Sequence, residues 1–175
     1  MRIGIDARFY GSDKGIGRYS QELIANLEKI DQENEYIIFL RQENFDLYEP
    51  KSPNFKKILA PWRWYSFGEQ FLLPFKLYRQ KLDLVHFLHY NVPLIYFGRF
   101  IVTVHDIILI YFPSRHQGFF KYLSYEFKNL FFKLVLFFTV LKSETIITDS
   151  DFTKNRLKEH FKKINFSKIK TVYLG

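Results

Sequence analysis

Short apolar runs rich in β-branched and aromatic residues alternate along this chain with longer segments that have helical periodicity. Such alternation is typical of right-handed β–α–β units, because two parallel strands need a connection of a dozen or more residues between them. The pattern predicts an α/β domain with three layers, α/β/α, around a mostly parallel sheet. The strands are expected at residues 2–7, 35–41, 56–61, 83–87, 100–105, 144–148 and 170–174.

Four segments between these strands have helical spacing of apolar residues, at 17–30, 67–81, 119–142 and 151–163. Pro74 is expected to bend or split the second helix. The third is apolar around most of its circumference, with Lys121, Ser124 and Lys128 as a thin polar strip. It is therefore either a buried crossover or a membrane-docking element. Ser150 is expected to cap the fourth helix.

The 175 residues fit one domain with a sizeable core. The chain has no cysteine, which excludes disulfides, thiolate nucleophiles and cysteine-rich zinc sites. Its first residues lack the apolar region of a secretory signal, so a cytoplasmic location is expected. The longest charge-free apolar run, residues 134–141, is far too short to span a bilayer, and no transmembrane helix is predicted.

The net charge of +8 is compatible with an anionic partner. No nucleic acid is expected as that partner, because the chain shows no nucleic-acid-binding motif. The basic segment 154–163, together with Lys168 and Lys170, is either a solvated face or a contact for an anionic membrane surface. The solvated face is favoured, since runs of charge usually serve solvation.

Polar side chains follow several of the predicted strands: Asp6, His86, His89, His105, Asp106, Asp149 and Ser150. Ligands of open parallel sheets bind beyond the carboxyl ends of the strands, so a site is expected there. His105 could hydrogen-bond a sugar hydroxyl or transfer a proton, and Asp106 could orient the ring or cap the next segment.

The glycines Gly15 and Gly17 stand where a strand leads into a helix, with Ile16 between them. They either present backbone N–H groups to an anion or give the loop positive φ. Ser20 replaces the third glycine of a dinucleotide fingerprint, and the loop is too long for a nicotinamide site.

The triplet Asp149-Ser150-Asp151 has the D-x-D spacing that holds a divalent metal in some sugar transferases, but helix capping explains it better. The histidines lack the spacing of a zinc hydrolase. No metal and no cofactor are therefore predicted.

Taken in order, short motifs along the whole chain resemble the N-terminal half of family-four glycosyltransferases, retaining enzymes with the GT-B fold. The motifs are Ile3-Gly4-Ile5-Asp6-Ala7-Arg8, Gly15-Ile16-Gly17-Arg18-Tyr19, Glu69-Gln70 with Leu73-Pro74, Asp83-Leu84-Val85-His86, Asn91 with Pro93, Thr103-Val104-His105-Asp106, Phe112-Pro113, Thr148-Asp149-Ser150 and Val172-Tyr173-Leu174-Gly175. The family includes many mannosyltransferases and other hexosyltransferases that build polysaccharides and lipid-linked glycans.

The resemblance implies a Rossmann-like domain that is one half of a GT-B fold. It implies that His105, with Asp106, serves catalysis and that Gly15, Ile16 and Gly17 lie near the donor diphosphate. Acceptor-binding residues are implied at the start of the first helix and in the loop after the fourth strand: Arg18, Tyr19, His86, Tyr90 and Asn91. The expected partners are a nucleotide-diphosphate hexose and a glycan or lipid-linked acceptor.

The family's second domain, which grips the nucleotide, is absent from residues 1–175, so this chain alone is expected to be inactive. Three alternatives stay open. The chain is the acceptor-binding half of an enzyme whose second domain follows in the same polypeptide, a subunit that completes its site with a partner chain, or a non-catalytic module that docks on membranes or binds glycans. A peripheral position on the inner face of a membrane is compatible with each.

Overall fold

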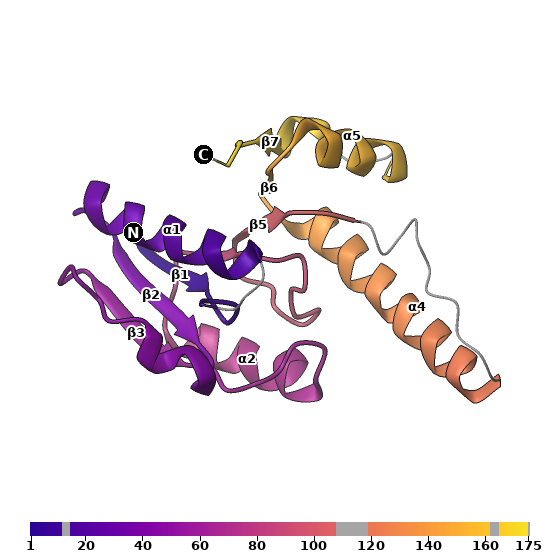
Figure 1. Ribbon diagram of the computed structural model, residues 1–175, viewed down its shortest axis with the longest axis horizontal. Helices are drawn as coiled ribbons and strands as arrows, with labels where there is room; N and C mark the ends of the chain where they lie inside the picture. Colours follow the sequence, from indigo (N-terminus) through magenta and orange to yellow (C-terminus); the bar gives the residue numbers. More distant parts are fainter. Residues whose placement is uncertain (12–14, 108–118, 162–164, 175) are drawn as a thin grey trace.

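The computed structural model describes residues 1–11, 15–107, 119–161 and 165–174, without the side chains of residues 119–125 and 128. Seven strands form one sheet in the order β3-β2-β1-β4-β5-β6-β7, and all neighbouring pairs are parallel (Figure 1). The strands are β1 (Arg2–Asp6), β2 (Glu35–Leu40), β3 (Phe55–Leu59), β4 (Leu84–Phe87), β5 (Phe100–Val104), β6 (Thr145–Thr148) and β7 (Ile169–Thr171). The predicted α/β, Rossmann-like fold class is confirmed.

The helices are α1 (Gly15–Ile30), α2 (Phe67–Arg79), α4 (Phe119–Lys142) and α5 (Asp151–His160), with two 3₁₀ turns at Gln42–Leu47 and Phe166–Lys168. Helix α1 begins two residues earlier than expected. The expected end of α5 at residue 163 lies outside the described residues, as does the Phe112-Pro113 motif. Of the two effects expected at Pro74, a bend or a split, the split does not occur, because α2 is continuous through this residue. The buried neighbours Leu73 and Leu77 hold this turn against the sheet and offset the lost hydrogen bond.

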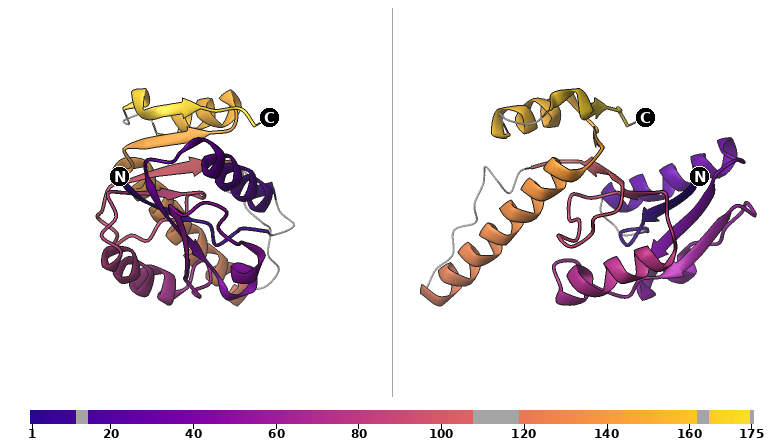
Figure 2. Two further views of the ribbon diagram at one scale, coloured as in Figure 1. Left: turned by 90° about the vertical axis from the view of Figure 1, so that its left-hand side faces the viewer. Right: turned by 180° about the vertical axis from the view of Figure 1, so that it is seen from behind.

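The strand order reverses direction between β1 and β4, so the crossovers before the reversal and those after it fall on opposite faces of the sheet. Helix α1 covers one face, where Ile24 packs with Ile5 and Ile38. Helices α2, α4 and α5 lie on the other face and contribute Leu73, Leu136 and Leu157 to a second core (Figure 2). The reversal leaves a crevice at the carboxyl edge of the sheet, the usual ligand position in such folds.

Helix α4 is the crossover between β5 and β6, and one side of it is buried through Phe132, Leu136 and Val140. Its N-terminal end extends away from the sheet (Figure 1). Phe127 and Leu130 are exposed on that part. The expected polar strip of Lys121, Ser124 and Lys128 lies outside the described side chains. Among the helices of the described ranges, none has the length and apolarity needed to cross a lipid bilayer.

Candidate functional site

The carboxyl ends of β5 and β6 and the first turn of α5 surround a cleft of about 660 Å³. Its walls combine acidic, hydroxyl and aromatic side chains: His105, Asp106, Ile107, Asp149, Ser150, Phe152, Thr153, Arg156, Tyr173 and Leu174. The edge at which a site was expected is therefore hollowed, and it gathers the predicted His105, Asp106, Asp149 and Ser150.

His105 lies at the wall of the cleft between two acceptor oxygens. Its Nδ1 is 3.3 Å from Asp149 Oδ2, and its Nε2 is 3.2 Å from the carbonyl oxygen of Leu88. The residue's own carbonyl accepts a hydrogen bond of 3.0 Å from the Thr153 hydroxyl. Asp149 after β6 and the β4–β5 loop thus contact the imidazole, and α5 contacts the backbone of the same residue.

Tyr19 joins the first turn of α1 to this histidine. Its ring packs edge-on against the His105 ring, with centroids 4.9 Å apart, and its hydroxyl lies 3.2 Å from Thr103 Oγ1. Burial raises the pKa of Tyr19, the Thr103 hydrogen bond opposes this, and Asp149 adds to it. Tyr19 therefore stays a neutral phenol beside the imidazole.

Thr103 is the shared partner of two site residues, because its Oγ1 also lies 2.9 Å from Nε2 of His86. His86 is buried inside the sheet rather than in the neighbouring loop. Burial first, and then the nearby His105, lower the pKa of His86 from 6.5 to about 4. His86 is therefore neutral near pH 7 and supports the site from behind instead of lining the cleft.

The glycine segment opens α1 directly. Gly15 and Gly17 lie in its first turn with helical backbone, and the positive φ of a flexible loop is found at Gly11 instead. Gly15 is exposed and a Cβ there would meet open space. Arg18 is exposed next to Tyr19. The first N–H groups of a helix lack helical acceptors, and Tyr19, two residues after Gly17, packs against His105.

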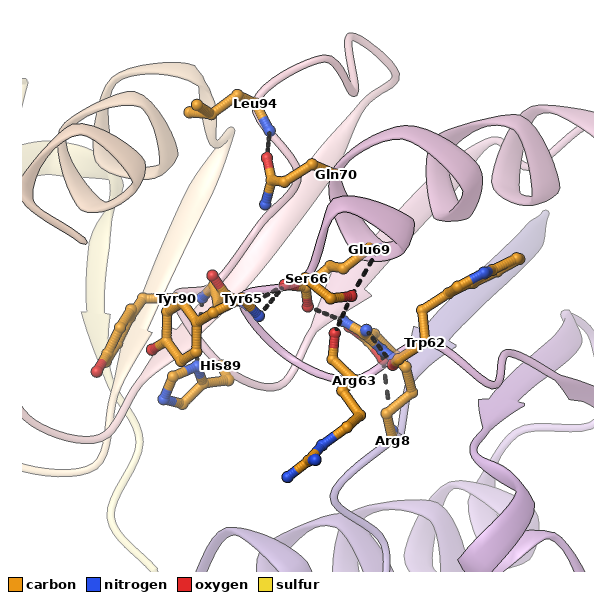
Figure 3. Close-up of polar contacts among 12 residues, drawn as sticks. Arg8, Trp62, Arg63, Tyr65, Ser66, Glu69, Gln70, His89, Tyr90 and Leu94 are labelled. Atoms are coloured by element: carbon orange, nitrogen blue, oxygen red, sulfur yellow. Dashed lines mark hydrogen bonds and ion pairs between the residues drawn. The ribbon is translucent and has the colours of Figure 1, made fainter. Parts of the chain in front are cut away.

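A buried ionic network holds the loops behind the cleft (Figure 3). The Arg8 guanidinium donates 2.7 and 2.8 Å hydrogen bonds to Asp6, a 2.7 Å bond to Glu69, and a 3.2 Å bond to the carbonyl of Trp62. Burial favours loss of its charge, but the two carboxylates outweigh this and raise the pKa of Arg8.

Glu69 accepts two further hydrogen bonds of 2.6 Å, from the Tyr65 backbone N–H and from the Asn91 side chain. Burial raises its pKa and Arg8 opposes that shift. Asn91, expected to bind an acceptor, is itself buried, and its Oδ1 has no hydrogen-bond partner in the described structure. The network ties together the ends of β1 and β3, the start of α2 and the β4–β5 loop.

Tyr65, whose backbone N–H is bound by Glu69, has an unusual backbone conformation. Its φ of 59° lies in the left-handed region that non-glycine residues rarely adopt. Its hydroxyl bonds that of Tyr90, and burial, mainly, raises the pKa of both phenols. Asp106 adds to both shifts, so it lies near this pair. Tyr90, another expected acceptor residue, is largely buried and its ring lies 3.9 Å from that of His89.

Ser150 caps α5, as predicted, by accepting a hydrogen bond from the Thr153 N–H. Asp151 accepts from Thr171 and Tyr173, and Asp149 faces His105. The D-x-D carboxylates therefore point to different partners. Within the described ranges, no three histidine or acidic side chains are grouped closely enough to hold a metal ion.

Sequence reasoning missed Thr103, Glu69 and Tyr65 as parts of this site. Tyr65 follows Trp62 and Trp64 in a short aromatic loop directly before a helix, a signal that could have singled it out. The Arg8–Glu69 pair spans 61 positions and carries no local signal.

Comparison with protein families gives one strong correspondence. The family described as Glycosyltransferase Family 4 matches residues 14–175. The comparison with curated proteins gives no match.

Proposed function

This chain belongs to glycosyltransferase family 4, and from that premise we propose that it forms the acceptor-binding half of a retaining hexosyltransferase of the GT-B type. The donor is a nucleotide-diphosphate hexose, with mannose as the sugar the sequence resemblance favours, and the acceptor is a glycan or a lipid-linked glycan. In the reaction an acceptor oxygen replaces the diphosphate oxygen at the anomeric carbon, and the acceptor hydroxyl loses its proton.

The single observation that carries this proposal is the setting of His105. Asp149 and the Leu88 carbonyl fix the ring at the wall of a cleft of about 660 Å³, with Tyr19 packed on its side. A ring held in this way can contact the transferred sugar and keep its anomeric carbon in place. His105 is the proposed catalytic residue, and Asp106 lies beside it on the cleft wall.

The donor diphosphate is proposed to lie at the first turn of α1, formed by Gly15, Ile16 and Gly17. The absence of a side chain at Gly15 leaves room for an anion at the N–H groups of this turn, which would stabilise negative charge on the leaving group. Arg18 and Tyr19 are proposed to stand at the acceptor's entry, and the buried Tyr90 and Asn91 to support the acceptor side from within.

The other half of the donor site is proposed to come from a second domain, in the same polypeptide or in a partner chain. Transfer sites of two-domain enzymes are completed by closure, which also excludes water. Residues 1–175 alone should bind nucleotide diphosphates weakly and transfer sugar slowly. The absence of cysteine is compatible with the reducing cytoplasm as the place of this reaction.

The test is the variant His105→Ala in a two-domain enzyme that contains this domain. Loss of the imidazole that holds the reacting sugar in place is expected to lower the transfer rate by roughly 100-fold or more. His160→Ala, which removes the histidine at the end of α5 outside the cleft, is the matched control and should retain transfer. An unchanged rate in His105→Ala would refute the proposed role.

A glycan-binding or docking module without chemistry would give a different result. Such a module would bind acceptor glycans with the same affinity whether or not a nucleotide sugar is present, and His105→Ala would not change that affinity. Equilibrium binding of the acceptor by residues 1–175, with and without the variant, separates this alternative from the enzyme.

A further inference from the structure

Helix α2 carries apolar residues both on the side that packs against the sheet and on the side that faces solvent. Its inner side packs Leu73 and Leu77 against the sheet. Its outer side presents Phe67, Phe71, Leu72, Phe75 and Tyr78, which we call the α2 face. A helix that only covers a sheet would place polar residues on that outer side.

The α2 face is strongly exposed. Phe67 is 86% exposed, Phe75 is 65% exposed, and the other three members are close to half exposed. The four aromatic rings together present on the order of 500 Å² of surface. That is at the upper end of the range for the largest apolar patch on a soluble monomer, and such patches usually mark binding sites.

The charged residues on the outer side of α2, and the one just before the helix, are positive. Lys76 and Arg79 lie on the outer side of the helix, and Arg63 is exposed just before it. The helix contains one carboxylate, Glu69, which is fully buried in the Arg8 network. Trp62 packs against Gly68 beside the face, with the Lys76 ammonium 5.8 Å from its ring centroid. Aromatic residues rimmed by cations, with no exposed carboxylate, are typical of helices that lie in a membrane interface.

The same charges disfavour a second copy of this chain as the occupant. Two such faces brought together would bury Lys76 and Arg79 against like charges, between molecules that each carry a net charge of +8. An anionic lipid surface would instead attract each cation by about 1 kcal/mol.

The basic C-terminal region, for which the sequence left membrane binding open, has several of its cations paired within the molecule. Arg156 pairs with Glu159, and Lys154 lies 4.0 Å from Asp151. The Lys168 ammonium is held by the carbonyl oxygens of Leu141 and Ser143, and burial lowers its pKa. Much of the charge in this region is thus engaged within the molecule.

We propose that the α2 face is a membrane-docking surface that inserts its aromatic residues into the headgroup region of an anionic bilayer. Its N-terminal end adjoins the candidate site, because Ser66 caps α2 directly after Tyr65, the residue that contacts Tyr90. A bilayer against α2 would therefore lie next to the acceptor side. The choice of acceptor, a lipid-linked glycan, rests on the proposed function, whereas the docking itself does not.

The experiment measures co-sedimentation of the full chain with phosphatidylglycerol-rich vesicles and with phosphatidylcholine vesicles. The unmodified protein should bind the anionic vesicles, and added salt should weaken binding. The variant Phe71→Ser/Phe75→Ser should lower the partition coefficient by roughly tenfold or more for each ring removed. Lys76→Glu/Arg79→Glu should abolish the preference for anionic lipid.

Ile30→Ser is the control, since Ile30 is an apolar residue that is 78% exposed at the end of α1 on the opposite face, and it should bind as the unmodified protein does. His105→Ala should also bind normally, so a failed transfer assay and failed docking remain distinguishable. Circular dichroism verifies that each variant is folded. Binding that survives the α2 substitutions and is lost in Phe127→Ser/Leu134→Ser would assign docking to α4 and overturn the proposal. So would absence of vesicle binding by the unmodified protein, or self-association that Phe71→Ser/Phe75→Ser removes.

Discussion

Arg8 is the residue at which three loops of the carboxyl edge converge. Its guanidinium contacts Asp6, Glu69 and the Trp62 carbonyl while its side chain is almost completely buried. Removing one partner of such a pair leaves an uncompensated charge in the interior. Tyr65 and Asn91 both donate hydrogen bonds to Glu69, so their positions depend on the Arg8–Glu69 ion pair.

We expect Glu69→Ala to lower the free energy of unfolding by about 3–5 kcal/mol, because Arg8 would lose a buried counter-charge. Urea denaturation measures the change. The double variant Arg8→Ala/Glu69→Ala should lose less than the sum of the single variants, since the second removal no longer strands a charge. Strictly additive losses would contradict the coupling.

His86 should make stability depend on pH. The ordinary pKa of a histidine side chain, 6.5, falls to about 4 at His86 in the folded protein, because of burial and then of His105. Between these values the unfolded chain binds the proton and the folded chain does not, so acidification favours unfolding. The contribution is fully present above pH 6.5 and is lost toward pH 4, to a total of about 3 kcal/mol.

The measurement is the free energy of unfolding across this range for the unmodified protein and for His86→Asn. The difference between the two proteins isolates the imidazole from other titrating groups. It should shrink as the pH falls from 6.5 to about 4. A constant difference would exclude a lowered pKa at His86.

At this scale the sequence predicted His105 and Asp149 as neighbours, because parallel strands place their carboxyl ends together. It did not predict that His86 and Asn91 would be buried. The alternation of β4 and the path of the β4–β5 loop decide which side chains face the cleft, and both depend on contacts with residues far away in the chain, such as Thr103 and Glu69.

Helix α2 shows how an element is fixed at its start. Ser66 accepts a hydrogen bond of 3.1 Å from the Glu69 N–H, and its own hydroxyl donates to the Arg63 carbonyl at 2.6 Å. The cap therefore orders both the helix and the loop that carries Tyr65.

Ser66→Ala should lower the free energy of unfolding by about 1 kcal/mol, since the cap acceptor is lost. Ser66→Asp retains an acceptor and places negative charge at the helix N-terminus, so it should be close to neutral. Thermal denaturation of both variants gives the comparison. Equal destabilisation by alanine and aspartate would show that the hydroxyl's bond to Arg63 matters more than the cap.

Most elements could be predicted from periodicity, with boundaries that differ by one to several residues. Strand β7 ends at Thr171 rather than at residue 174, and as an edge strand it pairs only with β6. Local propensity alone could not decide whether Pro74 splits its helix, because it ignores the tertiary packing of Leu73 and Leu77. The two 3₁₀ turns carry no periodic signal at all.

The molecule has two hydrophobic cores that share one sheet. Ile24 belongs to the core beneath α1, and Leu73 to the core beneath α2, α4 and α5. Because every strand contacts a neighbour in the sheet, loss of one core should destabilise the other.

Ile24→Ala and Leu73→Ala should each lower the free energy of unfolding by roughly 2–5 kcal/mol and shift one common transition. Far-ultraviolet and near-ultraviolet circular dichroism, followed in parallel during denaturation, should give coincident curves. Two separate transitions in either variant would show that the faces unfold independently.

The fold class could be predicted from the sequence, whereas the exposed apolar side of α2, proposed to face lipid, could not. The apolar spacing of α2 marks an amphipathic helix, but the pattern does not reveal which of two apolar sides turns outward. Glu69, buried in the Arg8 network, together with the buried Leu73 and Leu77, fixes which side of the helix faces the sheet.

The strand order has a consequence for folding during translation. The first 59 residues contain β1, β2 and β3, which are direct neighbours in the sheet. β4 then pairs with the free edge of β1, and each later strand pairs with the one made just before it. The sheet can therefore grow strand by strand in the order of translation, without waiting for any distant segment to arrive.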